Sequence, residues 1–452
     1  MIRFGYACKV LGVPHTATRT CILKHASPEN LLEISRYNLA ALQRMVEYNR
    51  AQQIPLLRLS SDVIPLASHP NVQFDWQTLC APELEALGRA IHGQKGSPQS
   101  EKNNCEGCNS KSALKSAPRS MEAGAEHYPI RVSMHPGQYT VLNSPRFDVV
   151  ERAVADLLFH ASFLDALGVG NDAKIVLHVG GVYGDKKAAL ARFKTAFEQL
   201  PQCVVRRLVL ENDEYSYAID EVLALCEDLQ IPAVFDVFHH SILAPKKGST
   251  LDWLRQSAKT WKEHDGRQKI HYSQQLAAGK PGSHSHSIAA AKFLSFYEQI
   301  QNLNLDIMLE VKDKNLSAVK CQNLCTQNLP RRALTDEWAR YKYTVLEKSP
   351  RHYQQFRNYL KADNPEALDF YKLLEEALEQ EITPGNALNA AQHVWGYLDE
   401  LAPASEKKKA LKKFQALKNS LLPLPSLKKQ LYALAQEQKQ AYLLQSLYFY
   451  PV

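Results

Sequence analysis

The sequence predicts an α/β protein with a (β/α)8 barrel, a TIM barrel, followed by a C-terminal all-helical extension. Short apolar runs of strand length recur from the N-terminus to about residue 310. Most successive runs are separated by about 20 to 40 helix-like residues, the room that a crossover between parallel strands needs. Beyond the last run only helical patterns follow. A doubly wound open sheet is the alternative fold, but it does not explain why nearly every run ends in a potential ligand.

Eight runs have the length and the β-branched content of strands that are buried on both faces. Helical periodicity, with apolar residues at i, i+3 and i+4, fills most of the gaps between them. The expected strands are 2–6, 56–59, 131–134, 174–178, 207–211, 233–236, 269–272 and 306–310. The clearest expected helices are 28–53, 150–167, 186–200 and 218–229.

We expect the barrel domain to span residues 1–313 and the helical extension to span 331–452. The sequence does not indicate a role for this extension. Residues 92–128 are rich in Ser, Lys, Asn and Gly and predict a flexible insertion. Its Cys105 and Cys108 form a lone CxxC, which is a weak zinc signal. The lysine cluster at 406–420 is interpreted as a solvated helix face, with DNA contact as the alternative.

The bulk composition is that of an ordinary soluble globular protein. A net charge of +7 permits an anionic partner without requiring one. The N-terminus has no signal-peptide pattern, no apolar run is long enough to span a bilayer, and the nine cysteines form no regular framework. We therefore expect a cytoplasmic protein with reduced thiols and no membrane partner. We also expect a monomer without a nucleotide cofactor.

The chemistry lies at the strand ends. Side chains at the last positions of parallel barrel strands meet at one face, where the active sites of this fold are built. Histidines and acids hold these positions or follow them in loops, and they are more than one ion can use. We predict two or three divalent ions that support phosphodiester hydrolysis through a metal-activated water. The expected ligands are His69, His135, His178, Glu211, Asp236, His239, His271, His284 and Glu310. The roles of His240 and His286 stay open.

Lys269 stands two residues before His271 on the same expected strand, so both side chains face the same way. It would bind the scissile phosphate, or carry a carbamate that turns it into a metal ligand. The expected catalytic residues are therefore Glu211, His178 and Lys269.

The motifs GYAC, ASHP, SMHPGQY, VLHVGGVYG, LENDE, DVFHH, KIHYS and MLEVKDK follow one another in this order. Over about residues 1–313 they resemble the UV damage endonuclease family, which are TIM barrels. The resemblance implies an endodeoxyribonuclease that nicks damaged double-stranded DNA immediately 5′ to cyclobutane pyrimidine dimers and 6-4 photoproducts. It also implies that the nine ligands hold manganese-type ions, with magnesium, zinc or cobalt as alternatives.

By the same resemblance Gln138 and Tyr139 would probe the DNA at the lesion, and Tyr6 would lie near the damage. An aromatic ring with an amide beside it can fill the space left by extruded bases. Val10 stands where some relatives carry asparagine, and His286 where several carry an acid.

Other functions are compatible with the same residues. An abasic-site endonuclease would keep the hydrolysis and change the substrate. A xylose-isomerase-like sugar isomerase or epimerase would need fewer metal ligands and no DNA groove. If the protein binds DNA without catalysis, replacing the ligands would leave cell survival after irradiation unchanged.

Overall fold

The structure is a computed structural model that describes residues 1–93, 129–245 and 247–450. The insertion expected over 92–128 lies outside the described residues, apart from His92 and Gly93 at the end of a helix. The Cys105–Cys108 pair lies outside them as well.

Eight parallel strands close into a barrel in chain order, as the sequence predicts. They are short apolar segments whose residues are nearly all buried, because each strand has the barrel interior on one face and helices on the other. The strands are β1 (Arg3–Ala7), β2 (Leu56–Leu59), β3 (Arg131–Met134), β4 (Lys174–His178), β5 (Leu208–Glu211), β6 (Ala233–Asp236), β7 (Lys269–Tyr272) and β8 (Asp306–Leu309).

The strand register aligns the expected ligands. His178 of β4 lies opposite Glu211 of β5, and Asp236 of β6 lies opposite His271 of β7. The backbone amides of Arg3 and Asp306 donate to the carbonyls of Leu305 and Gln268, each at 2.9 Å, which joins β8 to its two neighbours. The carboxyl ends of the strands therefore present their last side chains at one face.

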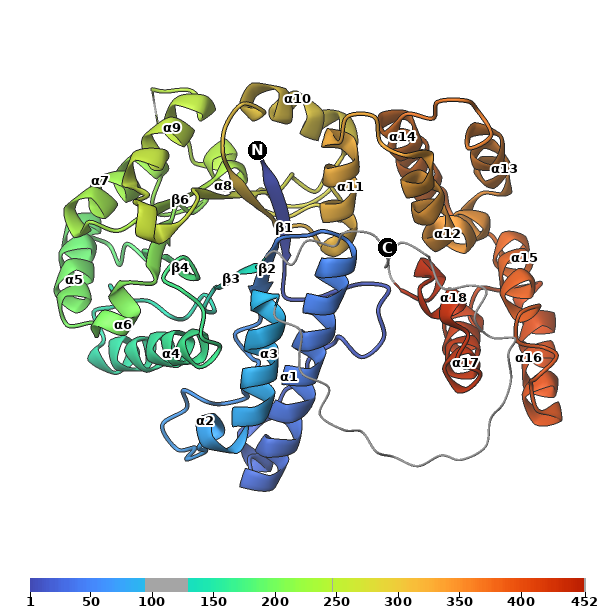
Figure 1. Cartoon of the computed structure of the whole chain (residues 1–452), viewed down its shortest axis with the longest axis horizontal. Coiled ribbons are helices and arrows are strands. Elements are labelled where there is room, and N and C mark those ends of the chain that lie inside the picture. Colours follow the sequence, from blue (N-terminus) through green and yellow to red (C-terminus); the bar gives the residue numbers. More distant parts are fainter. Residues whose placement is uncertain (94–128, 246, 451–452) are drawn as a thin grey trace. The chain divides into compact units, whose positions relative to one another are not determined.

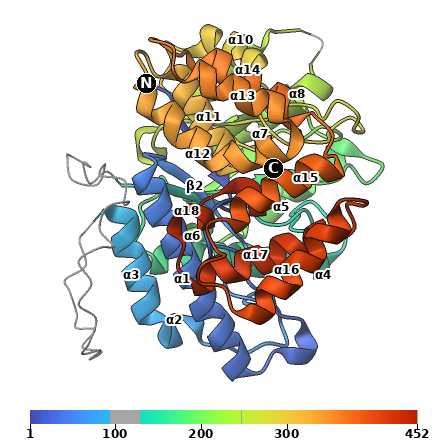
Figure 2. The ribbon, with the colours of Figure 1, turned by 90° about the vertical axis from the view of Figure 1, so that its right-hand side faces the viewer.

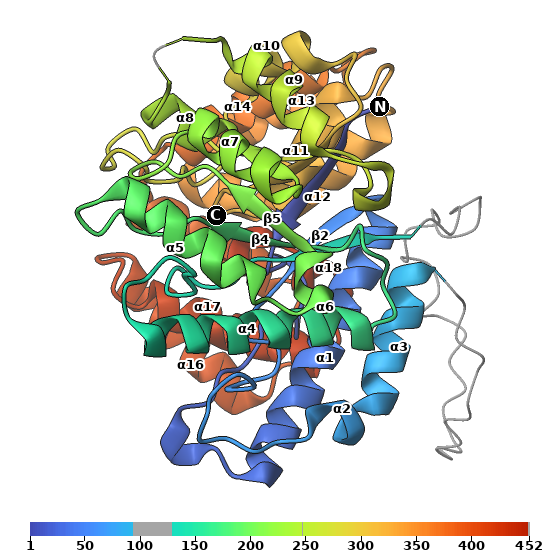
Figure 3. The same ribbon diagram turned by 90° about the vertical axis from the view of Figure 1, so that its left-hand side faces the viewer.

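Helices cover the outside of the strands, and Figure 3 shows α4 to α7 over β4 and β5. Side-chain caps mark where several begin: Ser27 caps α1 by accepting from the Asn30 amide, and Asp185 caps α5. The helices up to β7 are α1 (Pro28–Ala51), α2 (Trp76–Leu79), α3 (Ala81–His92), α4 (Phe147–Ala166), α5 (Lys186–Glu198), α6 (Gln202–Val205), α7 (Ile219–Leu229), α8 (Val237–Ile242) and α9 (Thr250–Thr260), with 3-10 turns at Leu23–His25 and Glu263–Asp265.

The chain forms two compact units. The first comprises residues 1–8, 16–272 and 304–308, and the second comprises residues 9–15, 273–303 and 309 onward. This division differs from the expected boundary after residue 313. The physical reason is that α10 (Ala290–Ile300) and α11 (Asn315–Cys325) contribute Ala290 and Leu316 to a core shared with the helices that follow.

The second unit confirms the helical extension (Figure 1, orange and red). One core gathers around Trp338, Phe356 and Phe370, and another around Tyr343, Phe414 and Leu431. Figure 2 shows α15 to α18 together. The helices are α12 (Arg331–Lys348), α13 (Pro350–Tyr359), α14 (Ala367–Leu378), α15 (Pro384–Trp395), α16 (Ala404–Leu417), α17 (Leu424–Glu437) and α18 (Ala441–Leu444), before a 3-10 turn at Leu447–Phe449. None of the helices within the described residues has the length and apolar character needed to cross a lipid bilayer.

Candidate metal centre

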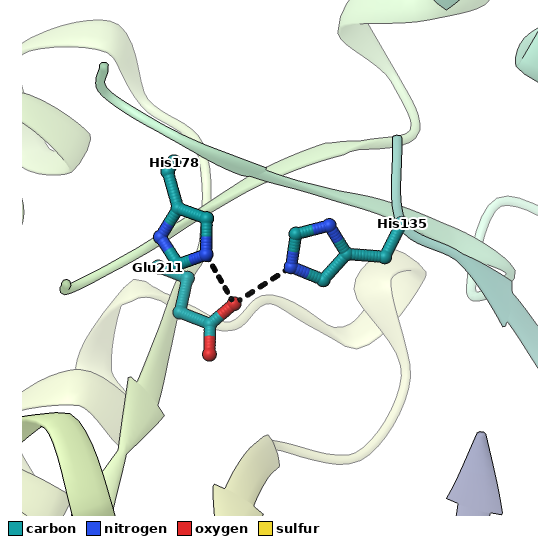
Figure 4. A group of neighbouring side chains, drawn as sticks. All are labelled: His135, His178 and Glu211. Atoms are coloured by element: carbon teal, nitrogen blue, oxygen red, sulfur yellow. Dashed lines mark hydrogen bonds and ion pairs between the residues drawn. The ribbon is translucent and has the colours of Figure 1, made fainter. Parts of the chain in front are cut away.

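Glu211 is the centre of the candidate site. It is the last residue of β5, and only 1% of its side chain is exposed. Its Oε2 atom lies 3.1 Å from Nε2 of His135, directly after β3, and 3.6 Å from Nε2 of His178, the last residue of β4. Figure 4 shows the two imidazoles converging on this one oxygen. Three successive strand ends therefore supply one group of ligands.

The second oxygen of Glu211 faces two further histidines. Its Oε1 atom lies 2.7 Å from Nδ1 of His271 and 3.9 Å from Nδ1 of His239. Four imidazoles thus surround one buried carboxylate. A carboxylate with both oxygens facing nitrogen ligands can connect two neighbouring ion positions.

Asp236 builds a second group with Glu211 and His239. As the N-cap of α8, its Oδ1 accepts a hydrogen bond of 2.7 Å from the His239 amide, so the start of the helix fixes where His239 stands. The His239 ring lies between acids: Nδ1 is 3.7 Å from Oδ2 of Asp236, and Nε2 is 3.5 Å from Oε2 of Glu214. The Nδ1 atom is also 2.9 Å from the Asn212 carbonyl.

The electrostatics of the site favour positive charge. Burial raises the pKa of Glu211, but the charges of His271 and His178 and the hydrogen bonds it accepts outweigh burial, so the pKa lies well below its usual range. Burial lowers the pKa of His178 and favours its neutral form, the form that binds metals. Burial also lowers the pKa of His239, but Asp236, Glu211 and Glu214 raise it to about 9.

The donor set fits divalent cations. His135, His178 and Glu211 each offer one atom, and these atoms lie within 4.8 Å of one another; the same holds for Glu211, Asp236 and His239. Two ligands that each stand about 2.1 Å from one ion are at most about 4.2 Å apart, so these groups need little adjustment to hold an ion. Imidazole nitrogen and carboxylate oxygen suit zinc, manganese and related ions. The buried Nδ1 of His178 has no hydrogen-bond partner within the described residues.

Besides His271, which faces Oε1 of Glu211, three expected ligands lie outside these two groups. His69 is half-buried in the loop after β2, where its Nδ1 accepts from the Asn71 amide at 3.2 Å. His284 and Glu310 belong to the second unit, where the His284 ring contacts the backbone oxygen of Glu310. Their role as ligands stays a prediction. His240 is buried edge-on against Phe235, and burial lowers its pKa.

Lys269 and Tyr6 are both fully buried, and the roles expected of them stay predictions. Lys269 opens β7 in the barrel interior, and its Nζ has no hydrogen-bond partner within the described residues. Burial, with the charge of Arg131 adding to it, lowers the pKa of this lysine. Tyr6 of β1 points to the helix layer, where it donates to Asn49 of α1. A position on a barrel strand therefore does not by itself place a side chain at the mouth.

Gln138 and Tyr139 lie in the open, as a contact with DNA requires. Tyr139 is 84% exposed, and both residues line a cavity of about 800 Å³ that also reaches His135 and His178. Sequence reasoning missed other side chains of this cavity. They include Tyr183 and Tyr215, together with Arg146 and Arg152. The two tyrosines stand in the loops after β4 and β5, so the strand-end rule that found the histidines could have found them.

Comparisons with known proteins find a family that matches most of the barrel sequence. A family model described as UV-endonuclease UvdE matches residues 2–96 and 105–334. Another, described as a protein of unknown function (DUF1722), matches residues 342–452. The first match ends and the second begins within α12.

Individual proteins agree with the family match. The chain is 37% identical over 381 residues to a UV DNA damage endonuclease of Clostridium perfringens, which covers 83% of each chain. It is 31% identical to a protein of the same name from Bacillus velezensis, over 67% of this chain and 85% of that one. The crystal structure of SacUVDE is similar with a TM-score of 0.60 and 34% identity, and covers 71% of this chain and 96% of that chain.

Proposed function

This chain belongs to the UV-endonuclease UvdE family and is an endonuclease that acts on DNA, and from this premise we propose how it acts. We propose that it nicks double-stranded DNA immediately 5′ to ultraviolet photoproducts in a metal-dependent hydrolysis. The observation that carries the proposal is the buried Glu211 carboxylate with four imidazoles around it. Such a donor set has no use in packing and suits cations that act on a phosphate.

We propose two or three divalent ions, manganese first, held by the ligands expected from the sequence. Bound divalent ions would lower the pKa of a water at the site and neutralise charge that develops on the phosphate. The proposed set comprises His69, His135, His178, Glu211, Asp236, His239, His271, His284 and Glu310.

The chain's own residues would prepare the site. Glu211 would stay ionised because its neighbours lower its pKa, and both of its oxygens would be available as ligands. The His178 ring would be neutral because burial lowers its pKa, and the Asp236 cap would hold His239 in place. Lys269 would bind the scissile phosphate, or carry a carbamate that turns it into a metal ligand.

Damage recognition would lie with Gln138 and Tyr139. The Tyr139 ring is exposed beside the cavity and would stack on bases next to an extruded photoproduct. A photoproduct is already distorted and poorly paired, so extruding it costs less than extruding normal bases. We keep the expectation of a monomer that works in the cytoplasm.

The test is a nicking assay on labelled duplexes. Purified protein with Mn²⁺ is incubated with an ultraviolet-irradiated duplex, the same duplex undamaged, and one that carries an abasic analogue. We expect a nick at the 5′ side of the photoproduct and none in undamaged DNA. Equal or faster cleavage of the abasic duplex would favour the abasic-site alternative, and no damage-dependent nick would refute the proposal.

A further inference from the structure

Lysines are concentrated on two helices of the second unit. Residues 404–439, which include α16 and α17, contain nine lysines and two glutamates, a formal charge of +7. The net charge of the whole chain is also +7. The basic excess of the protein is therefore equal to that of this short segment.

Another part of the same unit has the opposite charge. Residues 350–381, which include α13 and α14, contain four basic and seven acidic residues. Charge that served only solubility would not need to be separated in this way. A one-sign surface attracts a partner of opposite sign.

The outer side of α16 is the lysine side. Ala410, Phe414 and Leu417 face the core of the unit, and Lys408 and Lys412 stand on the opposite side of the helix, one turn apart and exposed. On α17, Leu427 and Leu431 are buried in the same way. The helices thus use their apolar sides for folding and leave the lysines for contact.

Lysines of the two helices lie on one stretch of surface. The Gln430 side chain donates to Oε2 of Glu406 at 2.8 Å, and Nζ of Lys413 donates to the Ser426 carbonyl at 3.0 Å. These bonds place the start of α16 beside the middle of α17 and the later part of α16 beside the start of α17, so the two helices run antiparallel. We define the basic face as Lys408, Lys412, Lys418 and Lys429. Their side chains are exposed and have no ion pair or hydrogen-bond partner within the described residues.

We propose that the basic face binds the phosphate backbone of duplex DNA without regard to sequence. The choice of DNA rests on the proposed function, because the enzyme must find rare lesions in a large excess of undamaged duplex. From Lys408 to Lys418 the helix rises about 15 Å, a length of duplex that carries about nine phosphates. Several lysines can therefore meet phosphates at once.

A membrane surface is the less favoured partner. A helix that binds lipid inserts its apolar side, whereas the apolar side of α16 is buried in the core. Leu411 in α16 and Leu422 between α16 and α17 are exposed, at 62% and 88%, but these are single leucines and not the apolar side of a helix. Charge without an insertable apolar side favours a polyanion in solution.

The test compares two full-length variants that each lose four positive charges. The face variant carries K408Q, K412Q, K418Q and K429Q. The matched control carries R351Q, R357Q, K361Q and K372Q, all exposed positions in the acidic part of the unit. Binding to an undamaged fluorescent duplex is measured by anisotropy in a chelator, so that no cleavage occurs, across a series of salt concentrations.

We expect the face variant to bind at least about tenfold more weakly at low salt and to have a smaller salt slope. The slope falls by about 0.9 for each phosphate that the protein no longer neutralises. We expect the control to match the unchanged protein, and a variant with arginine at the same four lysines to keep its affinity. Circular dichroism checks that the helices are intact.

Three results would overturn the proposal. They are an unchanged salt slope in the face variant, an equally weakened control, or a loss of binding to phosphatidylserine vesicles or duplex RNA with DNA binding intact. Nicking of irradiated duplex by the unchanged protein is measured in parallel. Its absence would refute the proposed function, while the salt slope would still decide the basic face.

Discussion

At the scale of single residues, one carboxylate organises the site. Glu211 is buried and accepts from His135 at 3.1 Å and from His271 at 2.7 Å. Two groups of metal ligands share this residue, so its loss affects both. His135, His178 and His271 come from strand ends and His239 comes from the first turn of α8, whereas Glu211 connects them.

We expect Glu211→Gln to lose bound metal and to reduce damage-dependent nicking by more than about 100-fold, since second-sphere changes alone cost about 10- to 100-fold. The amide keeps the shape but has no charge to attract cations. Metal content and single-turnover nicking are measured together. Glu227→Gln, on the exposed surface of α7, is the control and should resemble the unchanged protein. Normal metal content in Glu211→Gln would contradict the central role.

Tyr139 allows a separate test of damage recognition. We expect Tyr139→Ala to keep its metal and to nick irradiated duplex about 5- to 150-fold more slowly, the equivalent of about 1–3 kcal/mol of stacking on one base. Phe147→Ala, which removes an equally exposed ring outside the cavity lining, should have little effect. If both variants nick at the normal rate, Tyr139 does not stack on DNA.

At the scale of elements, ion pairs tie the barrel strands together at their N-terminal ends. Asp306 of β8 accepts from Nε of Arg3 in β1 at 2.6 Å and from Nη1 of Arg131 in β3 at 2.8 Å. Its carboxylate is fully buried. Burial raises the pKa of Asp306, but the two arginines outweigh burial and lower it.

We expect Asp306→Asn to destabilise the protein by about 3–5 kcal/mol at neutral pH, because buried arginines lose their counter-charge. The folded-state pKa of Asp306 is below its unfolded value, so the ionised acid stabilises the fold above the unfolded pKa. That stabilisation is lost as the pH falls through the folded pKa. The urea unfolding midpoints of the two proteins should therefore differ at neutral pH and become similar at acid pH. A difference that does not depend on pH would show that shape and not charge is responsible.

At the scale of the whole molecule, the two compact units each bury cores of their own. Val176, Val209 and Val234 pack with Trp261 into an apolar cluster that contains no ligand, so we expect the barrel core to form without ions. Metal should therefore govern activity and not the fold.

We expect chelator-treated protein to lose nicking and to keep its circular dichroism spectrum, and added Mn²⁺ to restore nicking. Binding to the folded state also raises the melting temperature. A matched sample treated with chelator already saturated with metal controls for the chelator. Full activity after verified metal removal would refute metal dependence, and loss of the spectrum would show that ions are needed for folding.

Sequence reasoning recovered the eight strands to within one residue at each end, together with most of the helices between them. Apolar runs buried on both faces leave little freedom in where a strand begins and ends. It also recovered the residues that surround Glu211, because the parallel arrangement brings strand ends to one face. The expected boundary after residue 313 stays a prediction, and residues 273–303 belong to the compact unit that contains the later helices.

The sequence by itself determined the barrel, the histidines and acids at its strand ends, and the helical character of the extension. Only the tertiary structure decided that Glu211 is shared by two groups, that Asp236 positions His239 as a helix cap, and that Tyr6 and Lys269 are buried. The pattern of a strand tells which residues come near its end. How deeply a side chain is buried and how far it lies from the other ligands depend on the register between strands and on what packs above it. Distant parts of the chain set both.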